Sequence, residues 1–520
     1  MKTNYVNSRI VIFLLAIVMV TLPISICSAA PKYPDTHIQP SISSPCVVIT
    51  LFQLAGIEKL PNITPKQVKV WQRMIEGQCI GHAELLAYAD YISAEFARAG
   101  YLTSYLSYPE QSLSLGILQA EVITGTISNV LAQGGSHLFP FKTGDVLNLR
   151  HIEQGLYNLQ NSVLIPYRIE LVHGSHNQHG TDVIVIGKNQ REWSGSLSTE
   201  YRSIKGSSST TANHVLTLAN PLRISDLLNI HYSLGYSQGN KRQSLAVSYS
   251  APYRYWLFSL YGDYQNSQSC IDLDDIELDL QQHQKALLLN TQYILSRTEN
   301  SLSSLIFGSK IQTIDTFLAG QRLMTQRRLA SYSTGEFIYQ RDFRQGHGEI
   351  SLKYMQGNNW FGANAAQITK LKPAQIYQLS FTSGWRNPSV YYQNGLDIQL
   401  SRAEVDSMLE RGSFIGQHGV QGFLSTERVE MGDNSLKLHN EFSWDIPWKR
   451  VQLYSSIGLG TTSNDRATFW RKNMLVGCKF GVRGAVGAVA YHVFFEAPLW
   501  QVNQVVANTL HSGFQLSINY

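Results

Sequence analysis

The chain has 520 residues and a formal net charge of +5, and charged residues make up only 15% of it. Ordinary soluble domains carry about 25% charged residues. The positive charge is spread along the chain without a basic block, so the sequence gives no case for binding nucleic acid. Aromatic residues reach 11%, with 27 Tyr and 9 Trp. That composition suits the aromatic girdles of a membrane barrel, although some soluble β-proteins are also rich in Tyr.

The N-terminus has the pattern of a secretory signal peptide. Basic residues flank an apolar run at 10–20, and the small residues Ser28-Ala29-Ala30 follow. A run of about eleven residues is too short to span a bilayer. We expect cleavage after Ala29, which gives a signal peptide at 1–29 and a proline-rich leader at 30–45. No later stretch is apolar for roughly 18 residues, so any membrane crossing is expected to use strands.

A first α+β module is predicted at 46–124. Apolar periodicity separates helices from strands, and Gly100 ends the second helix. The expected order is β-α-α-β-β, with elements at Val47–Phe52, Pro65–Ile75, Ala83–Arg98, Tyr101–Leu106 and Ile117–Ile123.

A second, shorter module is predicted at 125–190. Its expected elements are strands at Thr126–Val130, Tyr167–Val172 and Asp182–Ile186 and a helix at Asn148–Leu159. Three histidines lie in a glycine-containing loop of this module: His173, His176 and His179. We interpret them as solvated side chains and not as metal ligands.

Cys46 and Cys79 both fall in the first module. In an oxidising compartment two such cysteines favour a disulfide, and the alternative is a pair of buried free thiols. Cys270 and Cys478 lie far apart in the remainder of the chain, and we assign them no role.

The remainder, 194–520, has no convincing helix and many short strand-like runs. At about ten residues for each spanning strand, it has room for about sixteen antiparallel strands of a transmembrane β-barrel. A barrel of that width encloses a polar lumen. We expect Ala251–Arg254 to form a turn. The acidic run Asp272–Asp279 is predicted to be a solvated hairpin loop, because it lacks the glycine of a calcium loop.

The last seven residues alternate apolar and polar side chains up to a terminal aromatic. Phe514, Leu516, Ile518 and Tyr520 share one face of the expected strand. An apolar-out strand that stops on an aromatic is typical of the last strand of an outer-membrane barrel. The last strand of a soluble sandwich is the alternative.

Several blocks resemble the two-partner secretion transporters, the haemolysin-activation and filamentous-adhesin transporter family. Residues 79–118 are similar to the family's first polypeptide-transport-associated (POTRA) domain. The block 144–156, GDVLNLRHIEQGL, closely resembles the helix of its second POTRA domain and is the most specific in the sequence. Residues 245–252 are similar to an early barrel hairpin.

The resemblance also implies a loop that folds into the barrel, here at about 412–434. Its Val-Arg-Gly-aromatic signature corresponds to four residues, Val420, Gln421, Gly422 and Phe423, with Gly416 just before them. In the family the arginine faces an aspartate of an Asp-x-Gly motif on the barrel wall. Gln421 replaces the arginine, and Gly458 stands in the aspartate's position, two residues before Gly460. Losing both partners of a buried ion pair is nearly neutral, whereas losing one is costly.

We therefore expect the loop to fold inward but to be held less firmly than in the family. A second Val-Arg-Gly sequence occurs at Val482–Gly484, with small residues in place of the aromatic. We expect Arg483 to face the lumen or an interface.

The resemblance implies a non-enzymatic transporter without cofactor or metal, monomeric in the outer membrane of a Gram-negative cell, with periplasmic POTRA domains. Its partners are membrane lipid and an unfolded exoprotein, of the β-helical adhesin, haemolysin or contact-dependent toxin class. One alternative is a barrel-assembly insertase, for which more POTRA domains would be expected. A barrel enzyme is another, but no catalytic spacing stands out. A general porin is a third, against which the folded modules argue.

Overall fold

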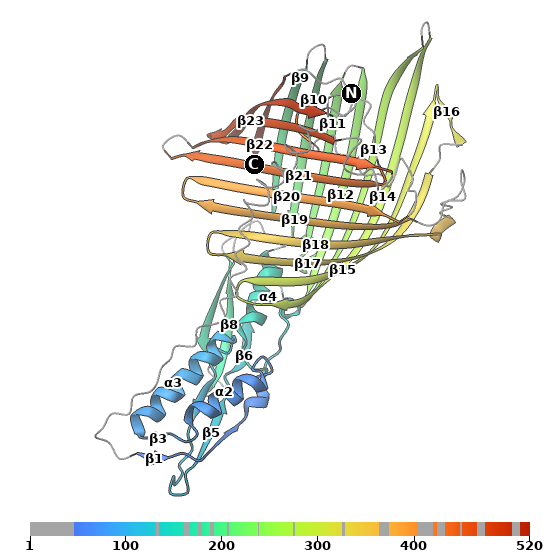
Figure 1. Cartoon of the computed structure of the whole chain (residues 1–520). Helices are drawn as coiled ribbons and strands as arrows, with labels where there is room; N and C mark the ends of the chain where they lie inside the picture. The colour runs from blue at the N-terminus through green and yellow to red at the C-terminus, as the bar shows by residue number, and fades with distance from the viewer. Residues whose placement is uncertain are drawn as a thin grey trace, which may run out of the picture. The chain divides into compact units, whose positions relative to one another are not determined.

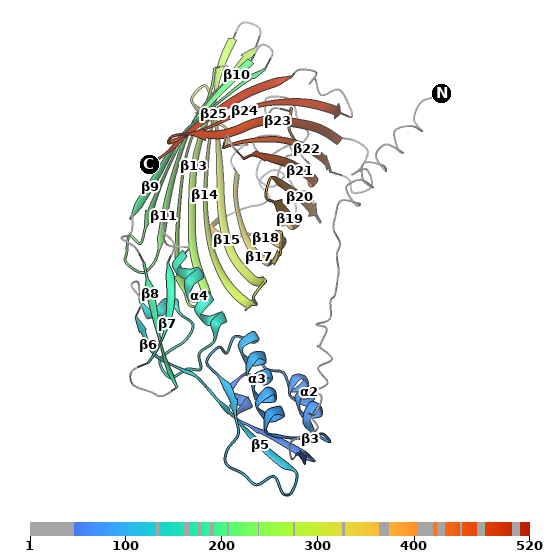
Figure 2. The same cartoon turned by 90° about the vertical axis from the view of Figure 1, so that its left-hand side faces the viewer.

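The structure is a computed structural model of the chain, shown in two views in Figures 1 and 2. It describes residues 46–131, 135–160, 167–174, 179–187, 192–204, 207–237, 239–273, 276–324, 328–362, 374–402, 420–423, 432–447, 450–464, 474–501 and 510–520. The expected signal peptide and leader lie outside these residues. The chain forms two compact units: one holds the residues up to Glu95 with Tyr105–Ile123, and the other holds Phe96–Ser104 with Thr124–Tyr520. No described helix is long and apolar enough to cross a membrane.

The first α+β module has the two expected helices and the two expected strands after them, but a short strand that was not predicted, β3, lies between the helices. Its elements are β1 (Val47–Val48), β2 (Leu51–Ala55), η1 (Ile57–Lys59), α2 (Pro65–Ile75), β3 (Cys79–Ile80), α3 (His82–Arg98), β4 (Tyr105–Ser107) and β5 (Ile117–Ile123). The sheet has the order β2-β5-β4, with β2 parallel and β4 antiparallel to β5. Helix α2 begins at Pro65 because Thr64 and Gln67 form a capping box and proline is favoured in the first turn.

The predicted strand Val47–Phe52 is wrong as a single element. The chain changes partners at Ile49: β1 pairs with β3, whereas β2 pairs with β5. Ile49 exchanges backbone hydrogen bonds with the turn before β3, and the Thr50 amide donates to Gly116 O at 2.7 Å. The predicted strand Tyr101–Leu106 is also too long at its start, because residues 101–104 form a turn in which the Ser104 amide donates to Tyr101 O.

An apolar interior and a disulfide hold the first module together. Phe52 and Tyr88 are each 2% exposed, and their rings meet edge to face with centroids 5.6 Å apart. The Tyr88 hydroxyl donates to Trp71 O at 2.9 Å, which ties α3 to α2. A disulfide joins Cys46 to Cys79 across a Cα–Cα distance of 5.3 Å, which confirms the predicted pairing.

The second α+β module is built on a smaller sheet. Its elements are β6 (Thr126–Leu131), η2 (Ser136–Leu138), α4 (Leu149–Gln160), β7 (Arg168–His173) and β8 (Gly180–Ile186). The strand order is β6-β8-β7, with β6 parallel and β7 antiparallel to β8. Its core is a cluster of nine buried apolar residues, Ile127, Leu138, Phe139, Phe141, Leu147, Ile152, Leu159, Val183 and Val185.

A closed barrel of sixteen antiparallel strands follows, as predicted. The strands are β9 (Trp193–Ile204), β10 (Ser207–Ala219), β11 (Leu227–Ser237), β12 (Asn240–Tyr253), β13 (Trp256–Leu273), β14 (Ile276–Arg297), β15 (Ser301–Leu318), β17 (Arg328–Phe343), β18 (Gly346–Asn358), β19 (Gln375–Asn387), β20 (Val390–Ser401), β21 (Asn434–Ile446), β22 (Val451–Ser463), β23 (Met474–Val486), β24 (Val489–Gln501) and β25 (His511–Asn519). Each strand pairs with its neighbours in the chain, and Figure 1 shows this consecutive order. The two-residue β16 (Gln321–Arg322) extends only the end of β15.

The barrel closes where β25 pairs with β9, which we call the seam. The four apolar residues of the last strand face outward as predicted, each 41% or 42% exposed. Tyr520 continues the pairing by exchanging backbone hydrogen bonds with Gly195. A Cβ on Gly195 would lie 2.4 Å from the Tyr520 ring, so the terminal aromatic covers the backbone of the first strand.

Two predicted loops are shorter in the structure. Strand β12 continues through Pro252 to Tyr253, which is opposite Trp256, so the turn contains only Arg254 and Tyr255. Arg254 has a φ of 54°, as a two-residue hairpin turn requires. Most of the acidic run 272–279 belongs to the paired ends of β13 and β14 and not to a loop. The only helix that the structure describes after Trp193 is the single 3-10 turn η4 (Trp360–Gly362).

Candidate functional site

Four residues of the expected inward loop, 420–423, lie against the inner barrel wall; we call them the inward segment. Val420 and Phe423 are each 3% exposed, so both apolar side chains are buried. Gly422 has a φ of 79°, and a Cβ there would lie 2.4 Å from the backbone of Ala497 on β24. The conformation and the close approach both require glycine. The other predicted loop residue, Gly416, lies outside the described residues.

Two wall glycines form the seat of this segment. A Cβ on Gly458 of β22 would lie 2.1 Å from Gln421 Oε1, and a Cβ on Gly477 of β23 would lie 1.7 Å from Gln421 O. The structure therefore brings Gln421 and Gly458 together, at the positions that the resemblance assigns to the arginine and the aspartate. Gly460 lies on the same inward side of β22, opposite Lys437 of β21. The sequence reasoning did not single out Gly477.

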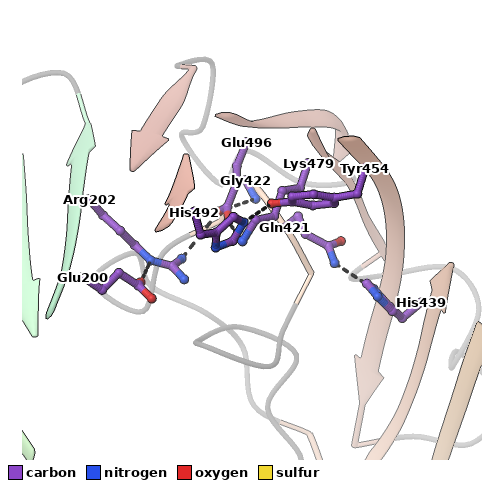
Figure 3. Close-up of polar contacts among 9 residues, drawn as sticks. All are labelled: Glu200, Arg202, Gln421, Gly422, His439, Tyr454, Lys479, His492 and Glu496. Carbon is purple, nitrogen blue, oxygen red and sulfur yellow. Dashed lines mark hydrogen bonds and ion pairs between the residues drawn. The ribbon is translucent and has the colours of Figure 1, made fainter. Parts of the chain in front are cut away.

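The side chain of Gln421 makes a neutral hydrogen bond to the wall. Its Nε2 lies 2.8 Å from His439 Nδ1 on β21, so the amide donates to an imidazole nitrogen that acts as acceptor. Figure 3 shows this contact on one side of the segment. A neutral bond of this kind contributes about 1 kcal/mol, roughly half the value of a charged one.

A chain of charges lies on the other side of the segment and joins three strands. Glu496 of β24 is 4% exposed and forms ion pairs with Lys479 of β23 at 3.0 Å and Arg202 of β9 at 3.6 Å. Arg202 also pairs with Glu200 on its own strand. The Gly422 amide donates to Glu496 Oε2 at 3.4 Å (Figure 3). The signs alternate along this chain, so its four charges sum to zero.

None of these four charged residues was identified from the sequence. The available signal was period-2 alternation, which places Val493 and Phe495 outside and Glu496 inside. Alternation predicts the face of a residue but does not identify a partner on a distant strand. The charge chain is therefore visible only in the structure, where closure of the barrel brings its members together.

Arg483, from the second Val-Arg-Gly sequence, does face the lumen. Its Nη2 lies 2.8 Å from Glu441 Oε1, and its guanidinium lies 4.9 Å from the centre of the Tyr454 ring. Arg483 lines a cavity of about 320 Å³ together with the inward segment and Glu496. The cavity is therefore lined by charged side chains of both signs.

The second feature of the site is an open sheet edge. In the first module, both outer strands have edge groups bonded to side chains: the Phe52 amide to Glu76, and the Leu106 amide to Ser93. Strand β7 of the second module is also an edge strand. Gly174 donates to Gly180 O, so alternation turns the amide of Leu171 away from β8. Among the described residues, no backbone partner covers this edge of β7.

Comparisons with known proteins agree with this architecture. Residues 179–484 match the family described as "Haemolysin secretion/activation protein ShlB/FhaC/HecB", residues 126–172 match "POTRA domain", and residues 47–125 match "POTRA domain, ShlB-type". The first match covers more than half of the chain. The chain belongs to this family. Its barrel lies in the outer membrane, its POTRA domains lie in the periplasm, and members of the family are transporters.

Curated relatives and solved structures support this assignment. "Outer membrane transporter CdiB" of Escherichia coli O6:K15:H31 is 26% identical over 88% of this chain and 80% of its own length. "Hemolysin transporter protein ShlB" of Serratia marcescens is 23% identical over 80% of this chain and 74% of its own length. The structure of CdiB from Escherichia coli has a TM-score of 0.83 at 21% identity, covering 93% of this chain and 92% of that one. This structural likeness concerns the fold.

Proposed function

We propose that this chain secretes one exoprotein of the β-helical adhesin, haemolysin or contact-dependent toxin class. The second POTRA domain captures the unfolded exoprotein in the periplasm, and the inward segment regulates its entry into the lumen. The observation that carries the proposal is the combination of an open edge on β7 with a buried, bonded inward segment. The proposal includes the domain limits: the first POTRA domain ends at residue 124, the second covers 125–190, and the barrel begins at residue 194.

Capture occurs by addition of a strand to β7. An exposed strand edge recruits an extended chain through backbone hydrogen bonds, which tolerate variation in the exoprotein sequence. Leu171 and Val172 are 37% and 45% exposed, so both faces of the strand offer apolar contacts to the incoming chain. The side-chain caps on β2 and β4 disfavour the same event in the first POTRA domain.

Leu171→Pro tests this proposal. Proline removes the outward amide of residue 171 without removing a bond to β8. We expect secretion of the exoprotein encoded beside this chain to fall severalfold, as measured in the culture medium. Leu171→Ala, which keeps the amide, is the matched control and should secrete nearly normally. Normal secretion by the proline variant would exclude capture at β7, and normal secretion without the whole chain would exclude the transport function.

The inward segment is the proposed regulator of entry. Val420, Gln421, Gly422 and Phe423 fix it to the wall, with Gly458 and Gly477 leaving room for it. Gln421→Arg brings an unpaired cation against Gly458, where the family has an aspartate, so we expect secretion to fall. Adding Gly458→Asp to that variant should restore secretion. If Gln421→Arg alone secretes normally, the segment does not regulate entry.

A further inference from the structure

Glu496 contacts both the inward segment and the seam strand β9. Its carboxylate receives the Gly422 amide at 3.4 Å and the Arg202 guanidinium at 3.6 Å. Lys479 holds its other oxygen at 3.0 Å. The carboxylate is 4% exposed, and the Lys479 side chain is 17% exposed. At equal length a charge-assisted hydrogen bond is stronger than a neutral one, so the long bond from the Gly422 amide to the carboxylate adds to the shorter neutral bond of Gln421 at 2.8 Å.

The ion pair between Glu496 and Arg202 passes over the last strand. Arg202 of β9 is opposite Gly513 of β25, and Gly513 is opposite Phe494 of β24. A Cβ on Gly513 would lie 2.3 Å from the Phe494 ring, so a larger residue would obstruct this path. The Arg202 guanidinium lies 5.2 Å from the centre of the Phe494 ring. The missing side chain at Gly513 thus allows the first strand to be tied to the second-last strand from inside the lumen.

We propose that Glu496 is a positioning residue that seats the inward segment and couples its seating to closure of the seam. This inference rests on the proposed role of the segment in secretion. When an exoprotein displaces the segment, Glu496 loses one of its three partners and the charge chain across the seam loosens. The inward segment of this chain therefore stays seated without the family's arginine, because its backbone is bonded to a carboxylate on a different strand.

The first experiment tests, without any exoprotein, whether Glu496 keeps the inward segment in place. Full-length protein is inserted into planar lipid bilayers, and the current is recorded for Glu496→Gln and for Glu441→Gln. Glu441 is the matched control, since it pairs with Arg483 at 2.8 Å in the same cavity but makes no bond to the inward segment. We expect Glu496→Gln to raise the current severalfold and Glu441→Gln, which changes the charge of the same cavity without touching the inward segment, to change it far less. Equal currents in the two variants would overturn the proposal.

The second experiment measures the seam. Ser198 and Ser517 are opposite each other on β9 and β25. Ser198→Cys and Ser517→Cys are combined with Cys270→Ser and Cys478→Ser, and the rate of disulfide formation is followed under mild oxidation. We expect Glu496→Gln to slow this reaction severalfold and Glu496→Asp, which keeps the charge, to restore much of the rate. A higher current with an unchanged rate would contradict the coupling.

A further variant separates the proposed effect from misfolding. Glu496→Gln leaves Lys479 without its anionic partner, which is strongly destabilising for a buried charge. The double variant Glu496→Gln/Lys479→Gln removes the charge of Lys479 and still lacks the Glu496 carboxylate, so it should show the same raised current. Wild-type current in a folded double variant would overturn the proposal. Because neither experiment uses an exoprotein, their outcome is independent of whether the wild-type chain secretes one.

Discussion

In the first POTRA domain, apolar contact holds the elements together, whereas in the lumen, the inward segment is held by polar bonds in addition to the burial of Val420 and Phe423. Phe52 and Tyr88 are nearly inaccessible to solvent, and their packing requires the exclusion of water. The inward segment lies beside a charged cavity, and its backbone is bonded to Glu496. An apolar core is suited to permanent structure, while bonds that water or a passing chain can replace are suited to a part that must move.

The largest expected effect is the loss of the first domain's core. Phe52→Ala should lower the free energy of unfolding of this domain by about 3–5 kcal/mol, because it leaves a cavity among buried side chains. Hydrogen exchange on the full-length protein should show faster exchange in 46–123 and no change in the barrel. Leu51→Ala is the control, since Leu51 is 41% exposed on the same strand. Equal effects of the two changes would contradict an apolar core at Phe52.

Loss of the disulfide should have the second-largest effect on stability. Cys46→Ser/Cys79→Ser releases a loop with a sequence separation of 33 and should cost about 2–4 kcal/mol of the same domain's stability. The measurement is again hydrogen exchange over 46–123, with and without reductant. Cys270→Ser/Cys478→Ser serves as the control and should leave this domain unchanged, since Cys270 lies in β13 and Cys478 in β23 of the barrel. A domain insensitive to both reductant and substitution would rule out a stabilising bridge.

Two alanine substitutions in the glycine seat should differ in a predictable way. At Gly477 the new Cβ would meet the backbone of Gln421, so the inward segment has to move, at a cost of about 1–3 kcal/mol. At Gly458 it would meet only the end of the Gln421 side chain, which can rotate away. We expect faster amide exchange in 420–423 and a higher channel current for Gly477→Ala than for Gly458→Ala. The reverse order would place the segment elsewhere.

The same contrast explains which features could be predicted from the sequence and which could not. Helix Pro65–Ile75 and strand Ile117–Ile123 were predicted at their observed limits, because apolar periodicity and local caps encode them. The break at Ile49 was missed, because Val47–Phe52 is apolar at every position except Thr50 and its change of partner depends on distant residues. In the barrel, alternation predicted the outward face of the last strand but could not relate Glu496 to Arg202, 294 residues away along the chain.

The resemblance was needed for the inward segment. Nothing in the composition of 420–423 predicts that it lies against Gly458, and only the family's signature suggested the pairing. The replacement of Arg by Gln was visible in the sequence, but Glu496 and Gly477, which hold the backbone, carry no signature. Side chains that bind backbone groups of a distant segment leave little trace in a single sequence.

The smallest expected effect lies in the hydrogen bond between α3 and α2. Tyr88→Phe removes the bond from the hydroxyl to Trp71 O and should cost about 1 kcal/mol of the first domain's stability at pH 7. Hydrogen exchange over 46–123 measures this loss. A loss as large as that of Phe52→Ala would mean that the ring itself had moved.

The pH dependence of this variant sharpens the comparison further. Burial raises the pKa of the Tyr88 phenol above its ordinary value near 10, and the nearby Tyr108 phenol adds to the shift. Above about pH 10 the unfolded chain therefore releases a proton that the folded domain retains. The contribution of Tyr88 to the free energy of unfolding then falls by about 1.4 kcal/mol per pH unit. Below about pH 10 this contribution is fully present. Tyr88→Phe should weaken this alkaline decline in the first domain, and since Tyr108 is also buried with a raised pKa, part of the decline should persist. An alkaline decline as steep as that of the wild type would show that Tyr88 ionises freely and that the interior of this domain admits water.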